Sequence, residues 1–516
     1  MTQLQTQHGL LEGERRGAHL VFRGIPFAKP PTGKLRFRAP EPPEPWTGLR
    51  SAREFGPSSL QARQAGSAPG LATALDRCSE DCLYLNVYTP ATDSARRPVF
   101  FWIHGGAFTL GSGSESLYDG GPLAERGDVV VVTINYRLGA LGFSHWSEAE
   151  RARLGVTSNA GCLDQIAALR WVRDNILAFG GDPNAVTIAG ESAGAYSVAM
   201  LLGMPTARGL FQRAITQSGA RLTRGSGDPT RATSELRRTL EIAPEQLEAL
   251  WDVEADRFLA AQQLVAARMA TPGGTVPFAP VCDADTLPLP LDQALTNGMC
   301  ASVPLLIGTN RDEINLFLGP ELKRLNEPLA DAELMKRLSD LVPDASVERL
   351  RALVEVYYRS RASRGLPHGE RALLAAISSD ALWRVPSSRF AEAFRANQSQ
   401  PATFQYLFTY ESPAMRGAMR SCHALELAFV FGALEAPGQA QFAGSGEAVR
   451  RLSERMMDSW LAFTRSGDPS VIGQMWPAYD LERRPTMVFS LESRLDHAPY
   501  EEERAAWEGL SPRPLH

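Results

Sequence analysis

Long apolar runs and clustered positive charge are both missing from this sequence. Its 516 residues hold no stretch of about 18 consecutive apolar residues, so we expect no transmembrane helix and no membrane partner. The first segment, MTQLQTQHGLLEGERRGAHL, lacks a basic start followed by an apolar core, so we expect no secretory signal and a cytoplasmic protein. The formal net charge is -5 and no basic stripe or tail is present, which argues against a nucleic-acid partner.

Cysteine is scarce, which bears on metal binding and on disulfides. The chain has 6 cysteines, and they are scattered. Cys78 and Cys82 lie four positions apart, but no second pair completes a zinc-binding set, so we expect no metal site. We expect free thiols in a reducing compartment.

Internal repeats, low-complexity tracts and dividing linkers are also absent. The composition, 44% hydrophobic and 22% charged, is typical of a soluble globular protein. The length alone suggests about three domains at roughly 150 residues each. One extended α/β sheet accommodates many insertions, however, and we predict a single domain over residues 1–516.

Apolar runs separated by helical segments predict an α/β protein with a large, mostly parallel sheet flanked by helices. Residues 159–183 predict a helix that stops at Gly180, because apolar residues recur at helical spacing up to that point. Two further stretches, 232–270 and 330–397, are predicted to be helical, and we expect insertions at roughly 220–275 and 314–400 over the active site. The predicted strands are 81–90, 98–104, 128–136, 185–190, 303–310 and 403–408.

The segment GESAGAYS contains the pattern G-x-S-x-G with Ser192 at its centre. Alone the pattern is weak, but here a predicted strand precedes it and a predicted helix follows it, as a nucleophile elbow requires. In such a sharp turn Gly190 and Gly194 avoid steric clash, and the helix N-terminus favours developing negative charge. The alternative is a glycine-rich turn without chemistry.

The segment IHGGAF follows the strand predicted at 98–104 and predicts an oxyanion hole. Gly105 and Gly106 allow the backbone to approach a substrate closely, and the N–H of Ala193 is the expected third donor. The alternative is a glycine turn at the end of a strand.

The residues alone leave several candidates for the acid and the base. Serine, acid and histidine follow one another along the chain in this fold, which leaves His368, His423, His497 and His516 as bases. His423 is favoured because it closely follows the predicted strand 403–408. Asp312 and Glu313 both follow the strand 303–310, and physical reasoning does not choose between them.

The chain resembles the type-B carboxylesterases, a family that includes bacterial para-nitrobenzyl esterases and the cholinesterases. The segments SEDCLYLNVYTP, WIHGGAF, NYRLGALGF and FGGDPNAVTIAGESAGA carry the resemblance, which extends over nearly the whole chain. It implies the α/β-hydrolase fold, with Glu313 as the acid and His423 as the base. It also implies Gly105, Gly106 and Ala193 as the oxyanion hole, and it places Glu191 and Ser218 close to the triad.

Three features depart from the family pattern. Tyr196 stands where the family often has a small residue, and Ile314 replaces the glycine of a D-E-G segment. Cys82 has only Cys78 upstream, whereas secreted animal members pair this cysteine with a distant one. This last departure favours an intracellular protein without that disulfide.

Together these features predict a serine carboxylic-ester hydrolase that acts through an acyl-enzyme on small to medium esters, without a metal or organic cofactor. An amidase, carbamate or lactone hydrolase with the same triad is the alternative, and a non-catalytic binding protein of the same fold is another. Phe317, Phe390 and Phe431 are candidates for an apolar gorge, although buried phenylalanine is usually core. The oligomeric state is left open.

Overall fold

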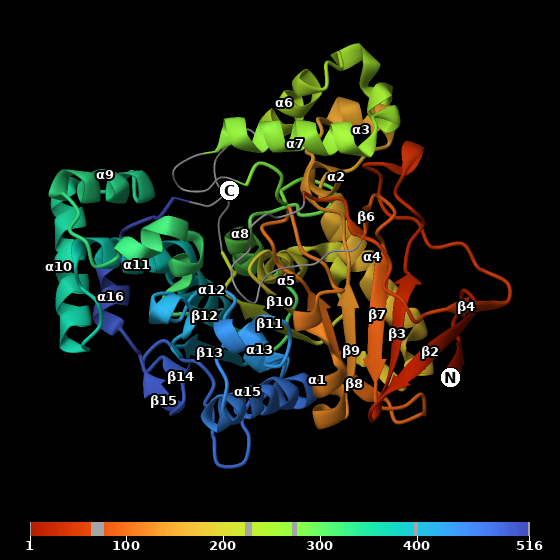
Figure 1. Cartoon of the computed structure of the whole chain (residues 1–516). Coiled ribbons are helices and arrows are strands. Elements are labelled where there is room, and N and C mark those ends of the chain that lie inside the picture. The colour runs from red at the N-terminus through yellow and green to blue at the C-terminus, as the bar shows by residue number, and fades with distance from the viewer. Residues whose placement is uncertain (1, 63–76, 222–229, 271–275, 397–400, 514–516) are drawn as a thin grey trace.

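The computed structural model describes residues 2–62, 77–221, 230–270, 276–396 and 401–513. Its centre is a 13-stranded sheet, in the order β1-β2-β3-β7-β9-β8-β10-β11-β12-β13-β14-β15, with β4 paired to β2 (Figure 1). A separate two-stranded sheet joins β5 (Ser58–Ser59) to β6 (Cys78–Ser79).

The middle of the large sheet is parallel, as the apolar runs predict. Every predicted strand is present, and β11 and β14 are additional strands. Both are short, and the sequence analysis did not identify them as strands. The antiparallel β15 (Arg494–His497) closes the edge. The parallel strands are β9 (Val130–Ile134), β8 (Arg97–Ile103), β10 (Gly181–Glu191), β11 (Arg213–Gln217), β12 (Leu305–Asn310), β13 (Thr403–Phe408) and β14 (Pro485–Phe489).

The other edge of the sheet is built by the first hundred residues. Only the strand at 81–90 was predicted in this region, because the rest is rich in proline and glycine. In the structure the edge strands pair antiparallel, apart from β4, which runs parallel to β2. They are β1 (Thr2–Gln5), β2 (Leu10–Arg16), β3 (His19–Pro26), β4 (Leu49–Ser51) and β7 (Tyr84–Thr89).

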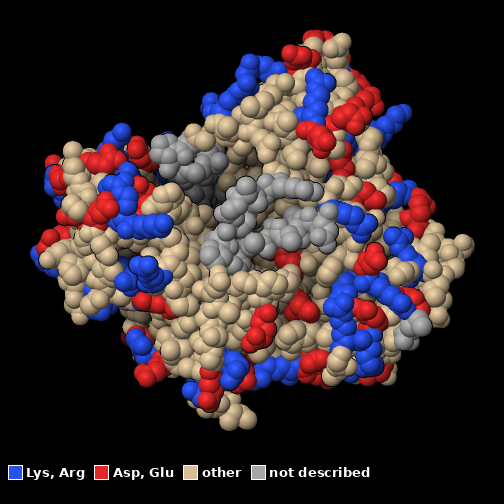
Figure 2. Space-filling view, in the orientation of Figure 1, with Lys and Arg blue, Asp and Glu red and all other residues tan. Residues whose placement is uncertain are grey.

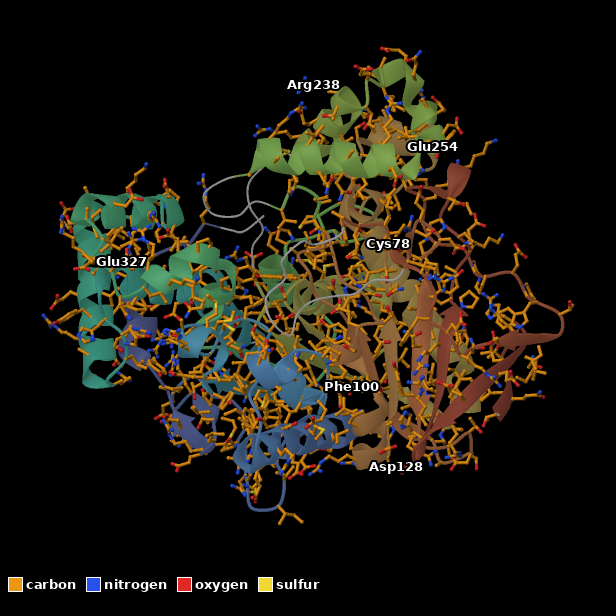
Figure 3. The ribbon with its side chains drawn as sticks, in the orientation of Figure 1. Cys78, Phe100, Asp128, Arg238, Glu254 and Glu327 are labelled. Atoms are coloured by element: carbon orange, nitrogen blue, oxygen red, sulfur yellow. The ribbon has the colours of Figure 1, made fainter. Side chains whose placement is uncertain are left out.

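Helices cover both faces of the sheet, so the side chains of its strands alternate between two cores. In β8, Phe101 and Ile103 belong to the core beneath α4 and α5, whereas Phe100 and Trp102 belong to the core beneath α15. Figure 3 labels Phe100 on the α15 side of the sheet. The covering helices include α1 (Gly121–Gly127), α2 (Gly139–Phe143), α4 (Ala160–Asn175), α5 (Ala193–Gly203), α8 (Leu291–Thr296), α13 (Leu427–Val430), α14 (Gln439–Phe442) and α15 (Glu447–Ser466). The short helix α3 (Glu148–Leu154) instead lies at the top of Figure 1, away from the sheet.

Two helical parts lie largely within the insertions predicted at 220–275 and 314–400, and the second ends with a helix, α12 (Val385–Ala396), that packs on β12 and β13 of the sheet. Residues 222–229, 271–275 and 397–400 of these ranges lie outside the described residues. The first part contains α6 (Arg231–Thr239), η5 (Pro244–Asp252) and α7 (Ala255–Met269), at the top of Figure 1. The second contains η6 (Glu313–Phe317), η7 (Gly319–Arg324), α9 (Asp331–Leu341), α10 (Val347–Ser363), α11 (Glu370–Ser379), the π-helical turn η8 (Asp380–Arg384) and α12 (Val385–Ala396).

The second helical part has a core of its own. Leu338, Tyr357 and Ile377 pack there with Trp507, which follows α16 (Glu501–Ala506). Figure 2 shows acidic and basic side chains interspersed over this face of the molecule, which is hollowed between the two helical parts. Among the described helices, none has the length and apolarity needed to cross a membrane.

Candidate active site

Ser192 occupies the sharp turn that the sequence predicts. Strand β10 ends at Glu191 and α5 begins at Ala193, and between them Ser192 has φ 54° and ψ -123°. A Cβ on Gly194 would lie 2.0 Å from the carbonyl oxygen of Ile103, so the helix reaches the sheet only because this residue is glycine. The turn holds Ser192 in a strained conformation of the kind that concentrates at functional sites.

The predicted oxyanion loop lies against this serine. A Cβ on Gly105 would be 3.1 Å from the Cβ of Ser192 and 2.7 Å from the carbonyl oxygen of Glu191. Gly106 has φ +106°, and a Cβ there would lie 2.2 Å from the carbonyl oxygen of Leu110. The absence of side chains at both positions therefore lets this backbone approach Ser192 closely.

His104 fixes the start of that loop. Its ring stacks on Tyr136 with the centroids 4.5 Å apart, and its Nδ1 lies 2.8 Å from the carbonyl oxygen of Gly105. The Tyr136 hydroxyl donates to the His104 carbonyl over 2.9 Å. Burial lowers the pKa of His104 to about 4, so the ring is neutral and Nδ1 is the donor to Gly105. His104 was not predicted as a site residue and entered the sequence motif only as the residue before Gly105 and Gly106.

Glu313 is the acid that the structure brings to the histidine. It is fully buried at the start of η6, directly after β12. Its Oε2 accepts a hydrogen bond from Nδ1 of His423 over 2.6 Å. Its Oε1 accepts from the Ser218 hydroxyl over 2.5 Å and from the backbone N–H of Asn310 over 2.7 Å. These bonds fix both carboxylate oxygens.

Asp312, the alternative acid, points elsewhere. Its carboxylate pairs with Arg311 at 2.7 Å and with Arg361 at 3.4 Å. Burial alone would raise the pKa of Asp312, but these two arginines lower it below its usual value. Asp312 is therefore an ion-pair partner of these arginines, whereas Glu313 is the carboxylate in contact with His423.

His423 is buried between two carboxylates. Its Nε2 lies 3.0 Å from Oε1 of Glu191, and within the described chain Nε2 has no hydrogen-bond partner. Burial alone would lower the pKa of His423, but the charges of Glu191 and Glu313 raise it well above its usual value. Of the other candidate bases, His368 and His497 are exposed, and His516 lies outside the described residues.

A further buried glutamate, Glu426, lies close to Glu191 and Glu313 and is held by two side-chain amides. It accepts hydrogen bonds from the side-chain amide of Asn310 over 2.6 Å and from that of Gln217 over 3.1 Å. Burial and the nearby charges of Glu191 and Glu313 raise the pKa of Glu426 to about 8. Glu426 was part of the histidine segment in the sequence, but its role was not predicted.

Two aromatic rings flank the imidazole. The centroids of Phe317 and Trp383 each lie 5.2 Å from that of His423, and the two rings stack on each other at 5.5 Å. Phe317 remains 55% exposed, so it presents apolar surface beside the imidazole. Phe390 and Phe431 are instead fully buried in the two main cores. Of the three phenylalanines considered for a gorge, only Phe317 touches the cluster, and Trp383 was not predicted.

The structure accommodates both residues that depart from the family pattern, Tyr196 and Ile314. Tyr196 is buried within α5, and the N–H of Ile314 donates to the Ser379 hydroxyl over 3.1 Å. No disulfide joins the cysteines, all of which lie in the described ranges. The described residues contain no group of three or more side chains suited to hold a metal ion.

The fold and the elbow define an α/β hydrolase, and comparison with known proteins assigns the family. The model of the carboxylesterase family matches residues 1–507. The chain is 40% identical over 503 residues to a para-nitrobenzyl esterase of Bacillus subtilis, covering 97% of each protein. It is 35% identical to a phenmedipham hydrolase of Pseudarthrobacter oxydans, covering 94% of each.

Solved structures agree with this assignment. A thermophilic para-nitrobenzyl esterase superposes with a TM-score of 0.84 at 37% identity, covering 98% of this chain and 99% of that one. A carboxylesterase of Geobacillus stearothermophilus has a TM-score of 0.84 at 39% identity, covering 98% and 100%. The chain belongs to the carboxylesterase family, and it is a carboxylic-ester hydrolase with the α/β-hydrolase fold.

Proposed function

We propose that Ser192, His423 and Glu313 form the catalytic triad of this esterase, and that residues 1–516 act as one catalytic domain. The observation that carries the proposal is the contact of Glu313 with Nδ1 of His423, which leaves Nε2 directed toward the elbow residue Glu191. A base held in this way has one nitrogen fixed and the other available for a proton.

In the proposed reaction, Nε2 of His423 takes the hydroxyl proton as Oγ of Ser192 attacks the ester carbonyl carbon. The tetrahedral intermediate collapses when the C–O bond to the alcohol breaks, and His423 returns the proton to the leaving oxygen. Water then attacks the acyl-enzyme by the same route and releases the carboxylic acid. Glu313 keeps the imidazole in the required tautomer and stabilises its charged form.

We further propose that the backbone N–H groups of Gly105, Gly106 and Ala193 form the oxyanion hole. The close approach of Gly105 to Ser192 supports this role, because donors must face the oxygen of the tetrahedral intermediate. One such donor contributes about 3 kcal/mol to transition-state stabilisation. Ser218 and Glu191 support the triad from either side: Ser218 donates to Glu313, and the charge of Glu191 acts on His423.

The test compares Ser192→Ala with a matched serine change on the same helix. Ser197 is buried in α5 and accepts a hydrogen bond from Gln165 over 2.9 Å. Ser192→Ala should reduce kcat for nitrophenyl esters by at least about 10⁴-fold, whereas Ser197→Ala should keep activity within about tenfold. Full activity in Ser192→Ala would refute the triad.

A related hydrolytic activity is the second candidate. The relative named for phenmedipham hydrolysis shows that the same family includes a hydrolase named for another substrate. An amidase, carbamate or lactone hydrolase would use the same residues. Matched esters, aryl amides, carbamates and lactones separate these activities: we expect kcat/KM to be highest for the esters, and for acyl chains of small to medium length.

The proposal requires no metal or organic cofactor, and a small-molecule ester is its only substrate. A binding protein without catalysis is disfavoured because serine, glutamate and histidine are all retained at the site. The expectation of a cytoplasmic enzyme without nucleic-acid or membrane partners stays a prediction, which fractionation of the source cells tests.

A further inference from the structure

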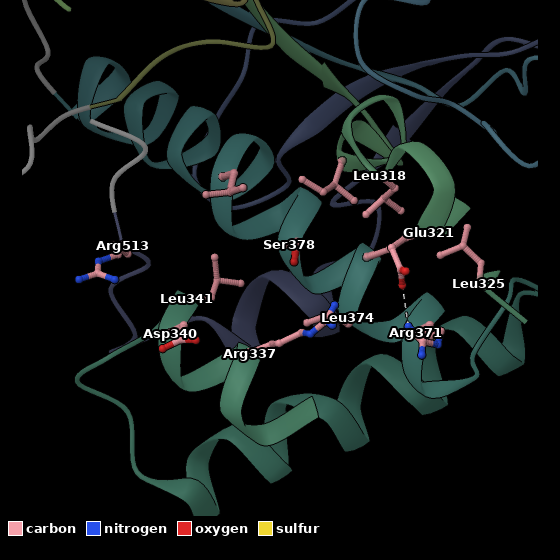
Figure 4. A pocket seen from close by; sticks show the side chains of 13 residues that line it. Leu318, Glu321, Leu325, Arg337, Asp340, Leu341, Arg371, Leu374, Ser378 and Arg513 are labelled. Atoms are coloured by element: carbon pink, nitrogen blue, oxygen red, sulfur yellow. Dashed lines mark hydrogen bonds and ion pairs between the residues drawn. The ribbon is translucent and has the colours of Figure 1, made fainter. Parts of the chain in front are cut away.

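A cavity borders the loop that carries Glu313, because Asp312 is one of its lining residues. It has a volume of about 920 Å³ and is bounded by η7, by α10 and α11, and by the segment 415–420 that precedes His423. A smaller cavity of about 210 Å³, shown in Figure 4, shares Leu325 and Ala375 with it and is lined by both leucines and charged side chains. In that smaller cavity Arg371 is paired with Glu321, so the positive charge of Arg371 is compensated.

The larger cavity has an excess of positive charge. Among the described residues that line it, four are cationic and Asp312 is the only acidic one. Asp312 already pairs with Arg311 at 2.7 Å and with Arg361 at 3.4 Å. The cationic residues are Lys323, Arg361, Arg416 and Arg420.

One further carboxylate, that of Glu411, does not line the cavity but pairs with the arginines beside it. Glu411 pairs with Arg420 at 2.9 Å and with Arg311 at 2.5 Å. Lys323 and Arg416 are both exposed, and neither has an ion pair with another described residue. Among the described residues, five cations therefore face two carboxylates here, and Lys323 and Arg416 are the two cations without an ion pair.

We propose that this cavity binds a small, multiply charged oxyanion through Lys323, Arg416 and Arg420. Guanidinium groups match the geometry of carboxylate and phosphate oxygens, and a concave site lined by one sign of charge concentrates the opposite ion. The free volume exceeds that of a single small anion and leaves room for two or three carboxylate or phosphate groups. None of Ser192, Glu313 and His423 lines this cavity, so the proposal does not depend on the proposed triad.

A ligand in this cavity borders both loops that carry the acid and the base. The backbone N–H of Asp312 donates to the carbonyl of Ser421 over 2.9 Å, and the N–H of Ser421 donates back to the Asp312 carboxylate over 3.4 Å. Met415 and Arg416 have φ of 52° and 58°, which is unusual for residues with side chains. The anion therefore binds against a strained segment that leads directly to His423.

Isothermal titration calorimetry with citrate and with inorganic pyrophosphate, at constant ionic strength, tests the site. The test variant is Lys323→Gln with Arg416→Gln, which removes the two uncompensated charges. The matched control is Lys34→Gln with Arg450→Gln, which removes the same charge from exposed residues that do not line the cavity. Far-UV circular dichroism and hydrolysis of a nitrophenyl ester establish that both proteins fold.

We expect saturable binding of at least one of the two anions to the wild-type enzyme and to the control. The Lys323→Gln/Arg416→Gln variant should bind it at least about tenfold more weakly. Binding of citrate alone identifies a carboxylate ligand, and binding of pyrophosphate alone identifies a phosphate ligand. The proposal is overturned if neither anion binds saturably up to about 10 mM, or if the variant and the control bind equally well.

Discussion

Oε2 of Glu313 lies 2.6 Å from Nδ1 of His423, although 110 residues separate the two in the chain. The end of β12 supplies the acid, and the segment after β13 supplies the histidine. Because β12 and β13 are parallel neighbours, their carboxyl ends meet at one edge of the sheet. The sheet thus positions the pair, and Ser192 projects from the end of β10 at the same edge.

Replacing the acid should reduce turnover without unfolding the protein. Glu313→Gln keeps the size of the side chain but loses the charge that fixes the His423 tautomer. We expect kcat to fall by about 10³–10⁴-fold with KM little changed. Ser218→Ala, which leaves the bond from Asn310 to Glu313 intact, should lower kcat by only about tenfold. Steady-state kinetics on a nitrophenyl ester measure both, and equal losses in the two variants would contradict these roles.

Removing the charge of Glu191 should move the pH profile. His423 acts as a base only when neutral, so activity rises with pH through its pKa. The negative charge of Glu191 raises that pKa, and Glu191→Gln therefore lowers it. We expect the acidic limb of kcat/KM to shift to lower pH. Glu115→Gln is the control: burial raises the pKa of Glu115 to about 8, so below that pH the native residue is already neutral. An unchanged limb in Glu191→Gln would contradict this account.

Phe317 and Phe390 should respond differently to truncation. Phe317→Ala removes an exposed ring beside His423, and we expect KM for aryl esters to rise about 3- to 10-fold while thermal stability is retained. Phe390→Ala empties a buried site and should lower the free energy of unfolding by about 3–5 kcal/mol with KM little changed. Kinetics and chemical denaturation of both variants distinguish these effects. An unchanged KM in Phe317→Ala would exclude the ring from the ester-binding surface.

A methyl group at Gly105 should interfere with catalysis more than with folding. Its Cβ would lie 2.7 Å from the carbonyl oxygen of Glu191 and 3.1 Å from the Cβ of Ser192, so the loop must shift away from the nucleophile. Loss of one oxyanion donor lowers kcat by about 10²–10³-fold, which is the expected effect of Gly105→Ala. Gly33→Ala is the control, because it makes the same substitution at a position where the added Cβ meets no other atom within 4 Å, although the φ of +53° there is strained for alanine. Unaltered kcat in Gly105→Ala would argue against this oxyanion loop.

The strands and the elbow were predictable because their signals are local. The run at 98–104 and the pattern around Ser192 each carry their physical reason within a few residues. The edge strands β1–β4 were missed because proline and glycine obscure the alternation there, and because edge pairing depends on partners distant in sequence.

The contacts of the site were predictable only in part. No property of Asp312 or Glu313 alone tells which one reaches a histidine, since the answer depends on the turn into η6 and on the arginines around Asp312. Trp383 was missed for a similar reason: a π-helical turn directs it to His423, and its spacing in the sequence resembles that of an ordinary core residue.

The central claim is that the elbow serine is the activated nucleophile, and covalent labelling tests it most directly. The intact enzyme is treated with a fluorophosphonate, and the modified peptide is located by mass spectrometry. We predict one adduct, on Ser192, formed in parallel with loss of esterase activity and at least about 10³-fold more slowly in His423→Ala. An adduct on another residue, or an enzyme that still hydrolyses esters after Ser192 is fully modified, would contradict the account.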